Sequence, residues 1–369
     1  MKIALISGAS SIHTIRWANG LAEAGHEVHV ITQHEPCDPF ISQVTVHSFP
    51  FRGVLGYFLM APKVRKLLHE LKPDVVNAHY ASGYATTARL AGARPFVLSV
   101  WGSDVYDFPY KSPLHRHLIR KNLLSADVVA STSHCMAEQT RSIAPNLSDI
   151  PITPFGVDMQ AYAHAKPVFA NNGNKLVIGT VKSMASKYGI DTQIEAFALL
   201  VKKLTSEQPN LADKLQLRLV GDGPQMDDYK KLTEKLGIDK KVDFIGRVPH
   251  QEVPNELAKL DIYVALSRLD SESFGVAIIE AGAARRPVVV SDAGGLPEVT
   301  IHGATGIVVP RENPQAAADA IEKLVLNPEL RLQMGEAGHK HVAETYSWDV
   351  CVEQMVKVLK DAQLKRHRK

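Results

Sequence analysis

Short runs of aliphatic and β-branched residues alternate with helical patterns along the whole chain of 369 residues. Such alternation is typical of parallel sheets whose crossover helices cover both faces. In the first half the expected strands are residues 2–7, 27–32, 44–49, 74–79, 96–101 and 127–132. In the second half they are residues 175–181, 215–221, 242–246, 261–266 and 287–292. The sequence therefore predicts an α/β protein with two doubly wound sheets.

The length of the chain fits two domains, because one domain usually takes about 100 to 200 residues. Residues 154–175 lack apolar periodicity and are rich in Pro, Asn and Gly, so they are the predicted linker. We expect an N-terminal domain over residues 1–165 and a C-terminal domain over residues 166–346. Residues 347–369 should form a helix that packs back on the N-terminal domain and ends in a basic tail.

Composition and charge argue against a nucleic-acid-binding, disulfide-rich, zinc-binding or membrane-spanning protein. Lys and Arg number 42 against 39 Asp and Glu, a formal charge of +3 that predicts no nucleic-acid partner. Cys37, Cys135 and Cys351 lie far apart, without the spacing of a disulfide framework or a zinc site. The apolar run at residues 3–6 is too short for a signal-peptide core, and no run approaches the roughly 20 residues of a membrane span. We expect a cytoplasmic protein, or one at the inner face of the membrane.

Residues 5–32 read as strand, small-residue turn, helix and strand, which is how dinucleotide-binding domains begin. Ile12 and His13 stand where that fingerprint needs further glycines, and residues 32–34 supply no acid for the ribose. A dinucleotide is therefore not expected. Gly8 remains either part of a plain tight turn or a place where the backbone approaches a hydroxyl-rich or anionic ligand.

Residues 267–299 contain two glutamates, Glu272 and Glu280, separated by seven residues and followed by a glycine pair. The two carboxylates do not share a helical turn, so the pattern does not match a pair of glycosidase acids. The loop between them instead directs backbone N–H groups at whatever lies above the start of the next helix. The plainer alternative is one solvated loop glutamate and one on a helix surface.

This arrangement resembles the family 4 retaining glycosyltransferases of the GT-B fold, whose hallmark is a glutamate, seven residues and a second glutamate. Four further stretches resemble family landmarks in the expected order, at residues 25–32, 154–158, 220–224 and 244–248. The resemblance spans nearly the whole chain and is nearest to bacterial glycosyltransferases of cell-surface polysaccharide and lipopolysaccharide. It implies an enzyme of the hexosyltransferase type with two Rossmann-like domains facing across a cleft.

The resemblance also implies roles for residues of the C-terminal domain. Glu272 would contact hydroxyls of the donor sugar, and Glu280 would hold the ribose of the nucleotide. Two cations would stabilise the leaving phosphates: Lys187, and Lys182 in place of the usual arginine. The other donor-binding candidates are Phe274, Gly275, Val276, Gly221, Gly223, Arg247, Val248 and, in the N-terminal domain, Gly8. For the glycines and residues 247–248 a plain turn is the alternative.

The N-terminal half departs from the family pattern at Trp101, where many members carry a histidine that is linked to the reacting sugar. His79 and Asp104 stand at strand ends and are the candidates to replace that histidine in catalysis. Trp101 could form a wall on which a sugar stacks, and His13 and Arg16 are further acceptor-side candidates. Each of these side chains could instead serve only in packing.

Residues 51–72 combine large apolar residues with Arg and Lys, which predicts a basic amphipathic helix. Such a helix can lie on an anionic membrane, and many acceptors in the family are linked to lipids. The alternative is a helix whose apolar face packs on the sheet.

The function expected from this resemblance is retaining transfer from a nucleotide sugar, with UDP as the expected nucleotide, to a glycan or lipid-linked acceptor. The process would be biosynthesis of a cell-surface polysaccharide or glycoconjugate. Two alternatives stay open: a sugar-nucleotide epimerase of the same fold, and a non-catalytic protein that binds sugar nucleotides. No cofactor and no essential metal are expected, since the chain lacks the Asp-any-Asp triplet of metal-using glycosyltransferases.

Overall fold

We analysed a computed structural model of the chain, which describes residues 1–147, 149–166 and 175–367. The contacts divide it into two compact units. Unit 1 comprises Met1–Gly156 together with the residues from Trp348 onward, and unit 2 comprises Val157–Ser347. The first boundary thus precedes the one expected at residues 165 and 166. Part of the predicted linker, residues 167–174, lies outside the described residues.

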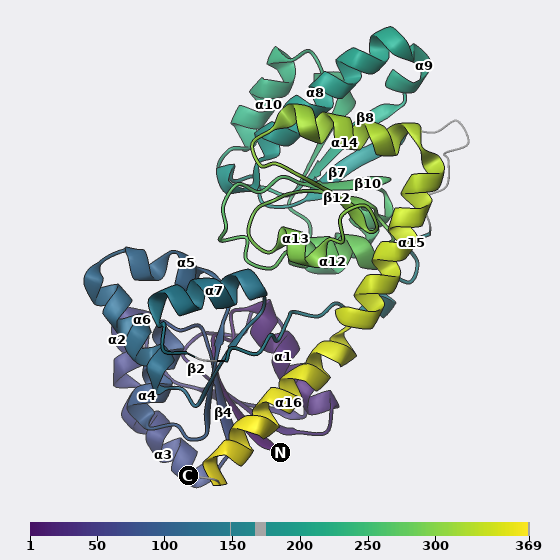
Figure 1. Ribbon diagram of the computed structural model, residues 1–369. Helices are drawn as coiled ribbons and strands as arrows, with labels where there is room; N and C mark the ends of the chain where they lie inside the picture. The colour runs from purple at the N-terminus through teal and green to yellow at the C-terminus, as the bar shows by residue number, and fades with distance from the viewer. Residues whose placement is uncertain (148, 167–174, 368–369) are drawn as a thin grey trace. The chain divides into compact units, whose positions relative to one another are not determined.

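The sheet of unit 1 contains six parallel strands in the order β3-β2-β1-β4-β5-β6. The strands are β1 Lys2–Ile6, β2 Glu27–Thr32, β3 Val44–Ser48, β4 Val75–His79, β5 Phe96–Val100 and β6 Val128–Ser131. The central strands read as nearly continuous apolar runs because helices cover both faces of the sheet (Figure 1). The strand order reverses direction between β1 and β4, the position where sheets of this type bind ligands.

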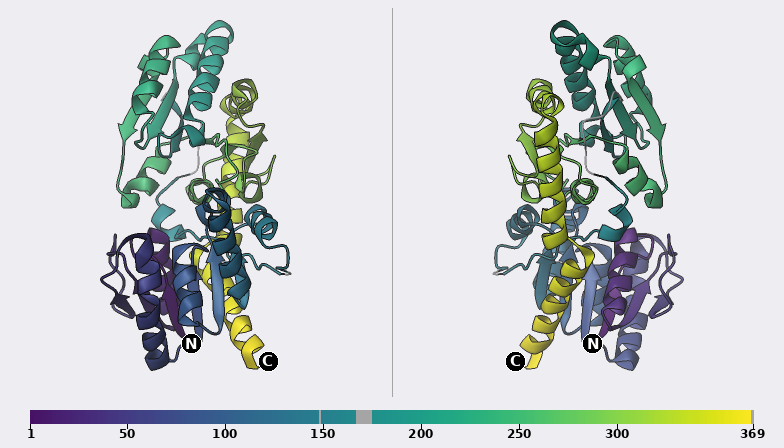
Figure 2. Two further views of the ribbon diagram at one scale, coloured as in Figure 1. Left: turned by 90° about the vertical axis from the view of Figure 1, so that its left-hand side faces the viewer. Right: turned by 90° about the vertical axis from the view of Figure 1, so that its right-hand side faces the viewer.

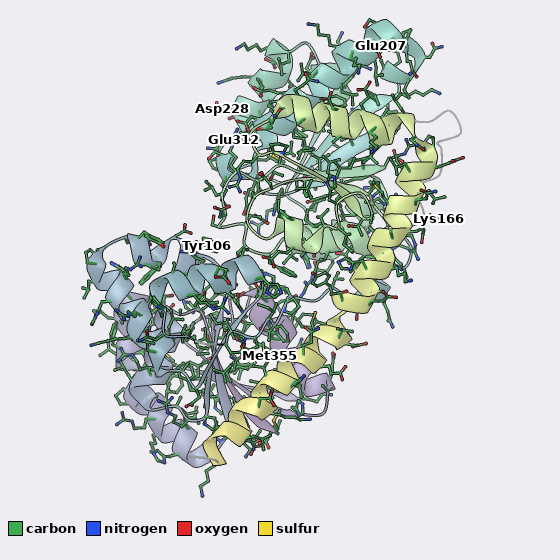
Figure 3. All side chains as sticks on the ribbon, viewed as in Figure 1. Tyr106, Lys166, Glu207, Asp228, Glu312 and Met355 are labelled. Carbon is green, nitrogen blue, oxygen red and sulfur yellow. The ribbon has the colours of Figure 1, made fainter. Side chains whose placement is uncertain are left out.

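The helices of unit 1 include the last helix of the chain. They are α1 Ile12–Glu23, α2 Gly53–Leu59, α3 Ala61–Leu71, α4 Gly83–Ala91, α5 Ser103–Tyr106, η1 Phe108–Tyr110, α6 Pro113–Ser125, α7 His134–Ile143 and α16 Trp348–His367. The ring of Trp348 on α16 lies 5.0 Å from that of Trp17 on α1, and Gln363 donates to Asp74. Met355 of α16, labelled in Figure 3, is buried. Helix α16 therefore lies along unit 1, as Figures 1 and 2 show.

The basic segment at residues 51–72 forms two helices and not the single one predicted. Helix α2 ends at Leu59 and α3 begins at Ala61, with Met60 between them. Pro62 has no N–H and cannot donate to the carbonyl of Phe58, so the hydrogen-bond ladder is interrupted there.

Unit 2 repeats the topology of unit 1 with six parallel strands in the order β12-β11-β10-β7-β8-β9. The strands are β7 Leu176–Val181, β8 Leu215–Val220, β9 Val242–Gly246, β10 Ile262–Ala265, β11 Val288–Ser291 and β12 Gly306–Val309. Here the order reverses between β7 and β10. Strand β12 was not predicted, because its apolar run of three residues is short.

The helices of unit 2 cover both faces of its sheet (Figure 1). They are η2 Met159–Tyr162, η3 Ser186–Tyr188, α8 Ile190–Glu207, α9 Pro209–Ala212, α10 Met226–Lys235, η4 Asp239–Lys241, η5 His250–Glu252, α11 Val253–Ala258, α12 Val276–Ala283, α13 Leu296–Val299, α14 Pro314–Leu326 and α15 Pro328–Thr345. Each unit has its own apolar core, with Phe96 and Leu98 buried in unit 1 and Phe197 and Leu217 in unit 2. None of the described helices is long and apolar enough to cross a bilayer.

Candidate active site

Lys182 and Glu272 meet at the point of unit 2 where the strand order reverses. Lys182 directly follows β7, and Glu272 lies in the loop after the adjacent strand β10. The ammonium Nζ donates to Oε1 of Glu272 over 2.6 Å, and the side chains are only 13% and 14% exposed. Burial alone would lower the pKa of Lys182, but the neighbouring Glu272 carboxylate raises it above its ordinary value. The lysine is therefore a permanent cation at the strand end.

The glycine pair Gly294 and Gly295 holds the loop that carries Glu272. Gly295 N–H donates to the carbonyl of Glu272 over 3.0 Å, and Gly294 N–H donates to Oδ1 of Asp270 over 3.2 Å. A Cβ atom on Gly294 would overlap the carbonyl oxygen of Glu272, and one on Gly295 would overlap that of Ser273. Only glycine lets the backbones after β10 and β11 approach this closely, which explains the glycine pair in the sequence pattern.

Glu280 lies on α12 and is buried. Its Oε1 atom is 3.9 Å from Nε2 of His250 in the neighbouring η5. Tyr263 of β10 is buried close by: burial raises its pKa, Lys182 lowers it, and Glu280 and Glu272 raise it. The Tyr263 hydroxyl thus lies within the electrostatic reach of all three charged groups. Neither His250 nor Tyr263 was predicted from the sequence, although a tyrosine inside an otherwise aliphatic strand is a signal that points to Tyr263.

Lys187 lies on η3 and is exposed. Its Nζ atom is 4.9 Å from the ring centroid of Tyr188, and Nζ of Lys182 is 4.7 Å from the same centroid. The aromatic face attracts both cations. The structure therefore brings the two predicted lysines to one ring, a relationship that the sequence did not indicate.

A cavity of about 490 Å³ adjoins Lys182 at the carboxyl ends of β7, β8 and β9. Its lining includes four predicted donor residues, Gly221, Gly223, Arg247 and Val248. Gly221 has a φ of +138°, and a Cβ atom there would overlap the carbonyl of Lys182. A Cβ atom on Gly223 would overlap the backbone of Met184. Both glycines thus bring two strand-end loops together at the wall of the cavity.

The start of α12 follows the Glu272 loop directly. Gly275 is its N-cap, with a φ of +99° that favours glycine, and Val276 is the first helical residue. The ring of Phe274 is buried and lies 5.7 Å from that of Tyr346, so Phe274 can offer a ligand only its backbone. The free N–H groups of a helix start, together with the helix dipole, favour an anion.

In unit 1, His79 is a buried core residue, which differs from its expected contact with a ligand. Asn77 uses its amide NH₂ on Val97 O and Ser99 Oγ, so its Oδ1 accepts from Nε2–H of His79 over 2.8 Å. Nδ1 of His79 then accepts from the hydroxyl of Ser7 over 3.0 Å. Burial lowers the pKa of His79 to about 3, so the imidazole is neutral.

Asp104 is also buried and organises two loops. Its carboxylate accepts from the N–H groups of Ala81, Trp101 and Gly102 over 2.7, 3.2 and 2.9 Å. Burial raises the pKa of this carboxyl, and the three N–H groups oppose that rise. The position predicted for a catalytic group therefore holds a carboxylate whose hydrogen-bonding capacity is used by backbone.

Trp101 is almost fully buried by other rings. Its ring centroid lies 4.1 Å from that of His79, 5.4 Å from Phe155 and 6.1 Å from His13. His13 in turn stacks on Phe155 at 4.2 Å. His13 and Arg16, both on α1, are partly exposed at this edge of the sheet, whereas Trp101 presents little surface for a sugar.

Gly8 follows β1 at the point where the strand order of unit 1 reverses. A Cβ atom at Gly8 would lie 3.5 Å from both Nδ1 of His34 and the ring of Tyr84, an ordinary contact distance. Tyr84, from α4, also hydrogen-bonds Thr32, at 3.2 Å. His34 and Tyr84 are polar groups at this edge, and neither was predicted from the sequence as a site residue.

Within residues 1–147, 149–166 and 175–367, no group of three His, Cys, Asp or Glu side chains is arranged to hold a metal ion. The expectation that no metal or cofactor is needed stays a prediction.

Two family models match the chain. "Glycosyl transferase 4-like" matches residues 2–133 and "Glycosyl transferases group 1" matches residues 163–341. Among similar proteins, the N-acetyl-alpha-D-glucosaminyl L-malate synthase of Bacillus anthracis is 27% identical, over 94% of this chain and 92% of that protein. A GDP-mannose-dependent alpha-(1-6)-phosphatidylinositol monomannoside mannosyltransferase of Mycobacterium tuberculosis is 26% identical, over 75% and 72%.

The fold also matches solved structures. The crystal structure of Anabaena Alr3699/HepE in complex with UDP superimposes with a TM-score of 0.79 at 18% identity, over 98% of this chain and 100% of that one. The lipopolysaccharide outer core galactosyltransferase WaaB superimposes with a TM-score of 0.72 at 14% identity, over 99% and 100%. The GT-B architecture expected from the sequence is thereby confirmed. The chain therefore belongs to the group 1 glycosyltransferases, enzymes of the hexosyltransferase type with the GT-B fold.

Proposed function

We propose that this glycosyltransferase moves a sugar from a UDP-sugar to a hydroxyl of a glycan or lipid-linked acceptor, with retention of the anomeric configuration. The observation that carries the proposal is the Lys182–Glu272 pair beside the 490 Å³ cavity. A diphosphate can replace Glu272 as the partner of the Lys182 ammonium. The carboxylate of Glu272 is then available to accept hydrogen bonds from hydroxyls of the sugar. The pair thus holds the two charges that a nucleotide sugar needs and keeps them neutralised until the donor binds.

The remaining donor contacts follow from the same geometry. Lys187 and the N–H groups at Gly275 and Val276 add positive potential for the diphosphate. The carboxylate of Glu280 would accept from the ribose hydroxyls. Arg247 and Val248 also line the cavity and would lie beside the base.

UDP is our choice of nucleotide because the Anabaena protein of the same fold was solved in complex with UDP, and also with UDP and glucose. The relatives in mycobacteria are named as GDP-mannose-dependent, so GDP-sugars form the second arm of the test. The relatives act on malate or on phosphatidylinositol mannosides by name, which supports a hydroxyl of a small polar or a lipid-linked acceptor. The process we propose is assembly of a cell-surface polysaccharide or glycoconjugate such as lipopolysaccharide.

In the proposed reaction, the bond between the anomeric carbon and the β-phosphate oxygen breaks while the acceptor oxygen bonds to the same face of the sugar. The acceptor proton passes to the departing phosphate, so no protein base is consumed. Lys182 and Lys187 stabilise the negative charge that develops on that phosphate. Glu272 orients the sugar through its hydroxyls. This scheme needs neither His79 nor Asp104 as a catalytic group, in keeping with their burial.

The test is incubation of the protein with UDP-glucose, UDP-N-acetylglucosamine and GDP-mannose, with and without candidate acceptors. Release of the nucleoside diphosphate is measured, the mass of the product is determined by mass spectrometry, and its anomeric configuration is determined by NMR. We expect slow hydrolysis of one donor, faster release with an acceptor, and a retained configuration. An isomerised sugar nucleotide would instead identify an epimerase, and binding without turnover a non-catalytic protein.

A second observation favours contact with an anionic membrane at its inner face. Helix α2 exposes Val54, Leu55 and Leu59, whose side chains are 74%, 72% and 60% exposed. Helix α3 continues directly with the cations Lys63 and Lys66, both exposed. Apolar side chains next to basic ones are what a peripheral membrane helix requires. The alternative, an apolar face that packs on the rest of unit 1, holds for the side of α3 that carries the buried Val64, but not for these exposed residues of α2.

Flotation with vesicles checks this part of the proposal. Wild-type protein should float with vesicles that contain phosphatidylglycerol and stay in solution with pure phosphatidylcholine vesicles. Val54→Asp with Leu55→Asp should abolish flotation, while Leu326→Asp, at an exposed leucine of α14 in unit 2, should not. Wild-type protein that remains in solution with both vesicle types would refute membrane contact.

A further inference from the structure

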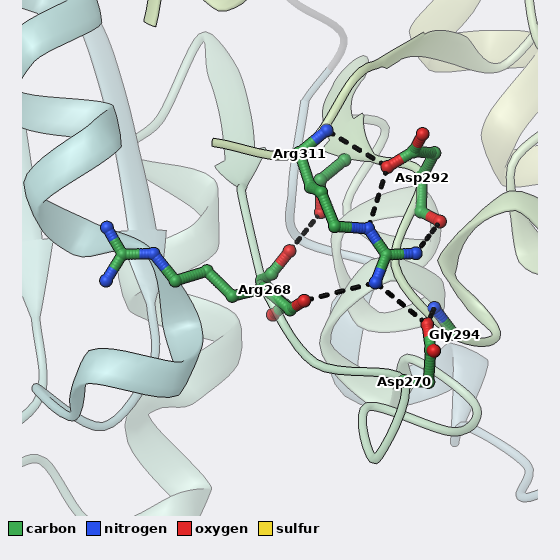
Figure 4. Close-up of polar contacts among 7 residues, drawn as sticks. Arg268, Asp270, Asp292, Gly294 and Arg311 are labelled. Carbon is green, nitrogen blue, oxygen red and sulfur yellow. Dashed lines mark hydrogen bonds and ion pairs between the residues drawn. The ribbon is translucent and has the colours of Figure 1, made fainter. Parts of the chain in front are cut away.

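We propose that Arg311 is a positioning residue for Glu272, and through it for the donor sugar; this inference rests on the proposed function. Arg311 follows β12 and makes hydrogen bonds to the loops after β10 and β11 (Figure 4). The loop after β10 carries Glu272 two residues beyond Asp270. One guanidinium therefore connects three neighbouring strand ends of unit 2.

The contacts of Arg311 on the β10 loop are made by Nη1. This atom donates to the carbonyl of Arg268 over 3.1 Å and to Oδ1 of Asp270 over 2.9 Å. The same Oδ1 of Asp270 accepts from the N–H of Gly294 over 3.2 Å. The side chain of Arg311 and the backbone N–H of Gly294 therefore both hold the loop at Asp270, two residues before Glu272.

The contacts of Arg311 on the β11 loop all go to Asp292. The backbone N–H and Nε of Arg311 donate to Oδ1 of Asp292 over 3.0 and 3.1 Å. Nη2 donates to the carbonyl of Asp292 over 2.7 Å. The guanidinium is planar with its donors in a fixed fork, so binding Asp292 along one edge fixes where Nη1 meets Asp270.

These contacts contribute little to overall stability. The side chains of Arg311, Asp270 and Asp292 are 34%, 62% and 51% exposed, and ion pairs of that exposure are weakened by the surrounding water. What they do fix is the path of the chain from Arg268 to Glu272. The carboxylate of Glu272 is held at its tip by Lys182, and a donor diphosphate that draws Lys182 away would remove that support. Arg311 would then support the loop together with the N–H groups of Gly294 and Gly295, because none of its contacts involves a residue predicted to bind the donor.

The experiment compares Arg311→Met, Arg311→Lys and Asp270→Asn with wild type. We expect Arg311→Met and Asp270→Asn to lower kcat/KM for the donor by about tenfold to a hundredfold, since a small misplacement of a positioning group has effects of that size. The inhibition constant of UDP should stay within about twofold of wild type, because UDP lacks the sugar that Glu272 would orient. The kcat/KM of Arg311→Lys should lie between those of wild type and Arg311→Met. The lysine ammonium is a point charge and cannot bind both carboxylates as the two edges of a guanidinium do. The kcat/KM of the double variant Arg311→Met/Asp270→Asn should be no lower than that of either single variant, because both changes remove the same contact.

The matched control is Lys203→Met, which removes another exposed cation of unit 2 that pairs with an acid, Glu322, over 2.8 Å. It should leave kcat/KM unchanged. A readout independent of turnover is amide hydrogen exchange: in Arg311→Met the N–H groups of Glu272, Gly294 and Gly295 should exchange faster than in wild type. Unchanged exchange, unchanged donor kinetics, or a UDP inhibition constant that rises as much as the donor KM would overturn the inference. A wild-type protein that releases no nucleoside diphosphate would instead refute the proposed function, and the exchange result would still decide the role of Arg311 in holding the loop.

Discussion

The ammonium of Lys182 and the carboxylate of Glu272 form a hydrogen-bonded ion pair of 2.6 Å although 90 residues separate them in the sequence. Lys182 directly follows β7 and Glu272 lies in the loop after β10, the two neighbouring strands of unit 2 between which the strand order reverses. Two opposite charges that are largely removed from water at that point are the central electrostatic feature of the site.

Removing one member of this pair should destabilise the protein, because the other charge is left buried without compensation. For Lys182→Met we expect the free energy of unfolding to fall by about 3 kcal/mol, together with loss of transfer. The double variant Lys182→Met/Glu272→Gln should regain most of that stability but no activity. Urea unfolding and donor turnover check both statements, and a double variant as unstable as the single one would contradict the pairing.

Glu272 and Glu280 should differ in what they bind. Glu272→Gln should lower donor turnover by about a hundredfold while UDP inhibits as in wild type, because its partner is the sugar. Glu280→Gln should raise the donor KM and the UDP inhibition constant together, because its partner is the ribose. Competition of UDP against the donor distinguishes the two variants. Equal effects on UDP binding would show that the assigned roles are wrong.

The contact between Gly295 and the Glu272 loop predicts a strong effect of a single methyl group. In Gly295→Ala the new Cβ would overlap the carbonyl of Ser273, so we expect a loss of about 1 to 3 kcal/mol in stability. Gly338→Ala is the control: Gly338 is helical on α15, and its Cβ would meet its nearest neighbour at 3.7 Å. Thermal unfolding of the two variants should show a lower Tm for the first and an unchanged or higher Tm for the second.

His79 predicts a pH dependence of stability. Its pKa is lowered from 6.5 to about 3 by burial, so between these values the unfolded chain binds more protons than the folded one. The contribution of His79 to the free energy of unfolding is complete above pH 6.5. It is lost as the pH falls below that value, at a slope of about 1.4 kcal/mol per pH unit.

Urea unfolding at several pH values between 7 and 5 measures the total slope. Other histidines whose pKa is lowered by burial add to it, namely His26, His34, His47 and His341. His79→Gln should flatten it, while His117→Gln, at an exposed histidine, should not change it. A wild-type stability that stays constant over this range would contradict the assignment of His79 as a neutral core residue.

Most elements were predictable because they depend on local patterns. The strand runs are apolar and bounded by polar or small residues, so β1, β2 and β7 were located to within a residue. Strand β12 was not predicted because a run of three apolar residues is too short to indicate a strand. Its pairing with β11 becomes visible only in the folded chain. The predicted helix at residues 51–72 divides because Pro62 removes one hydrogen bond, a local cause visible in the sequence.

The candidate site was predictable in its residue types and less so in its roles. The spacing of Glu272 and Glu280 and the following glycines directed attention to the loop that carries Glu272, whose role in binding a donor stays a prediction. His79 ends β4 as expected, whereas Asp104 lies on α5, beyond the end of β5. Both are buried, and burial depends on contacts with distant parts of the chain. Tyr188 and Arg311 carry no local signal, and Tyr263 carries only a weak one, a tyrosine within an otherwise aliphatic strand. Each matters through partners brought close by folding.

By itself the sequence determined the alternation of strands and helices, the family and the chemical groups available for a nucleotide sugar. Tertiary structure alone decided that β7 and β10 are neighbours, so that Lys182 reaches Glu272, and that Arg311 after β12 holds the loop before Glu272. The physical reason is that strand order and loop contacts are set by non-local packing. Periodicity and spacing record only what lies within a few residues along the chain.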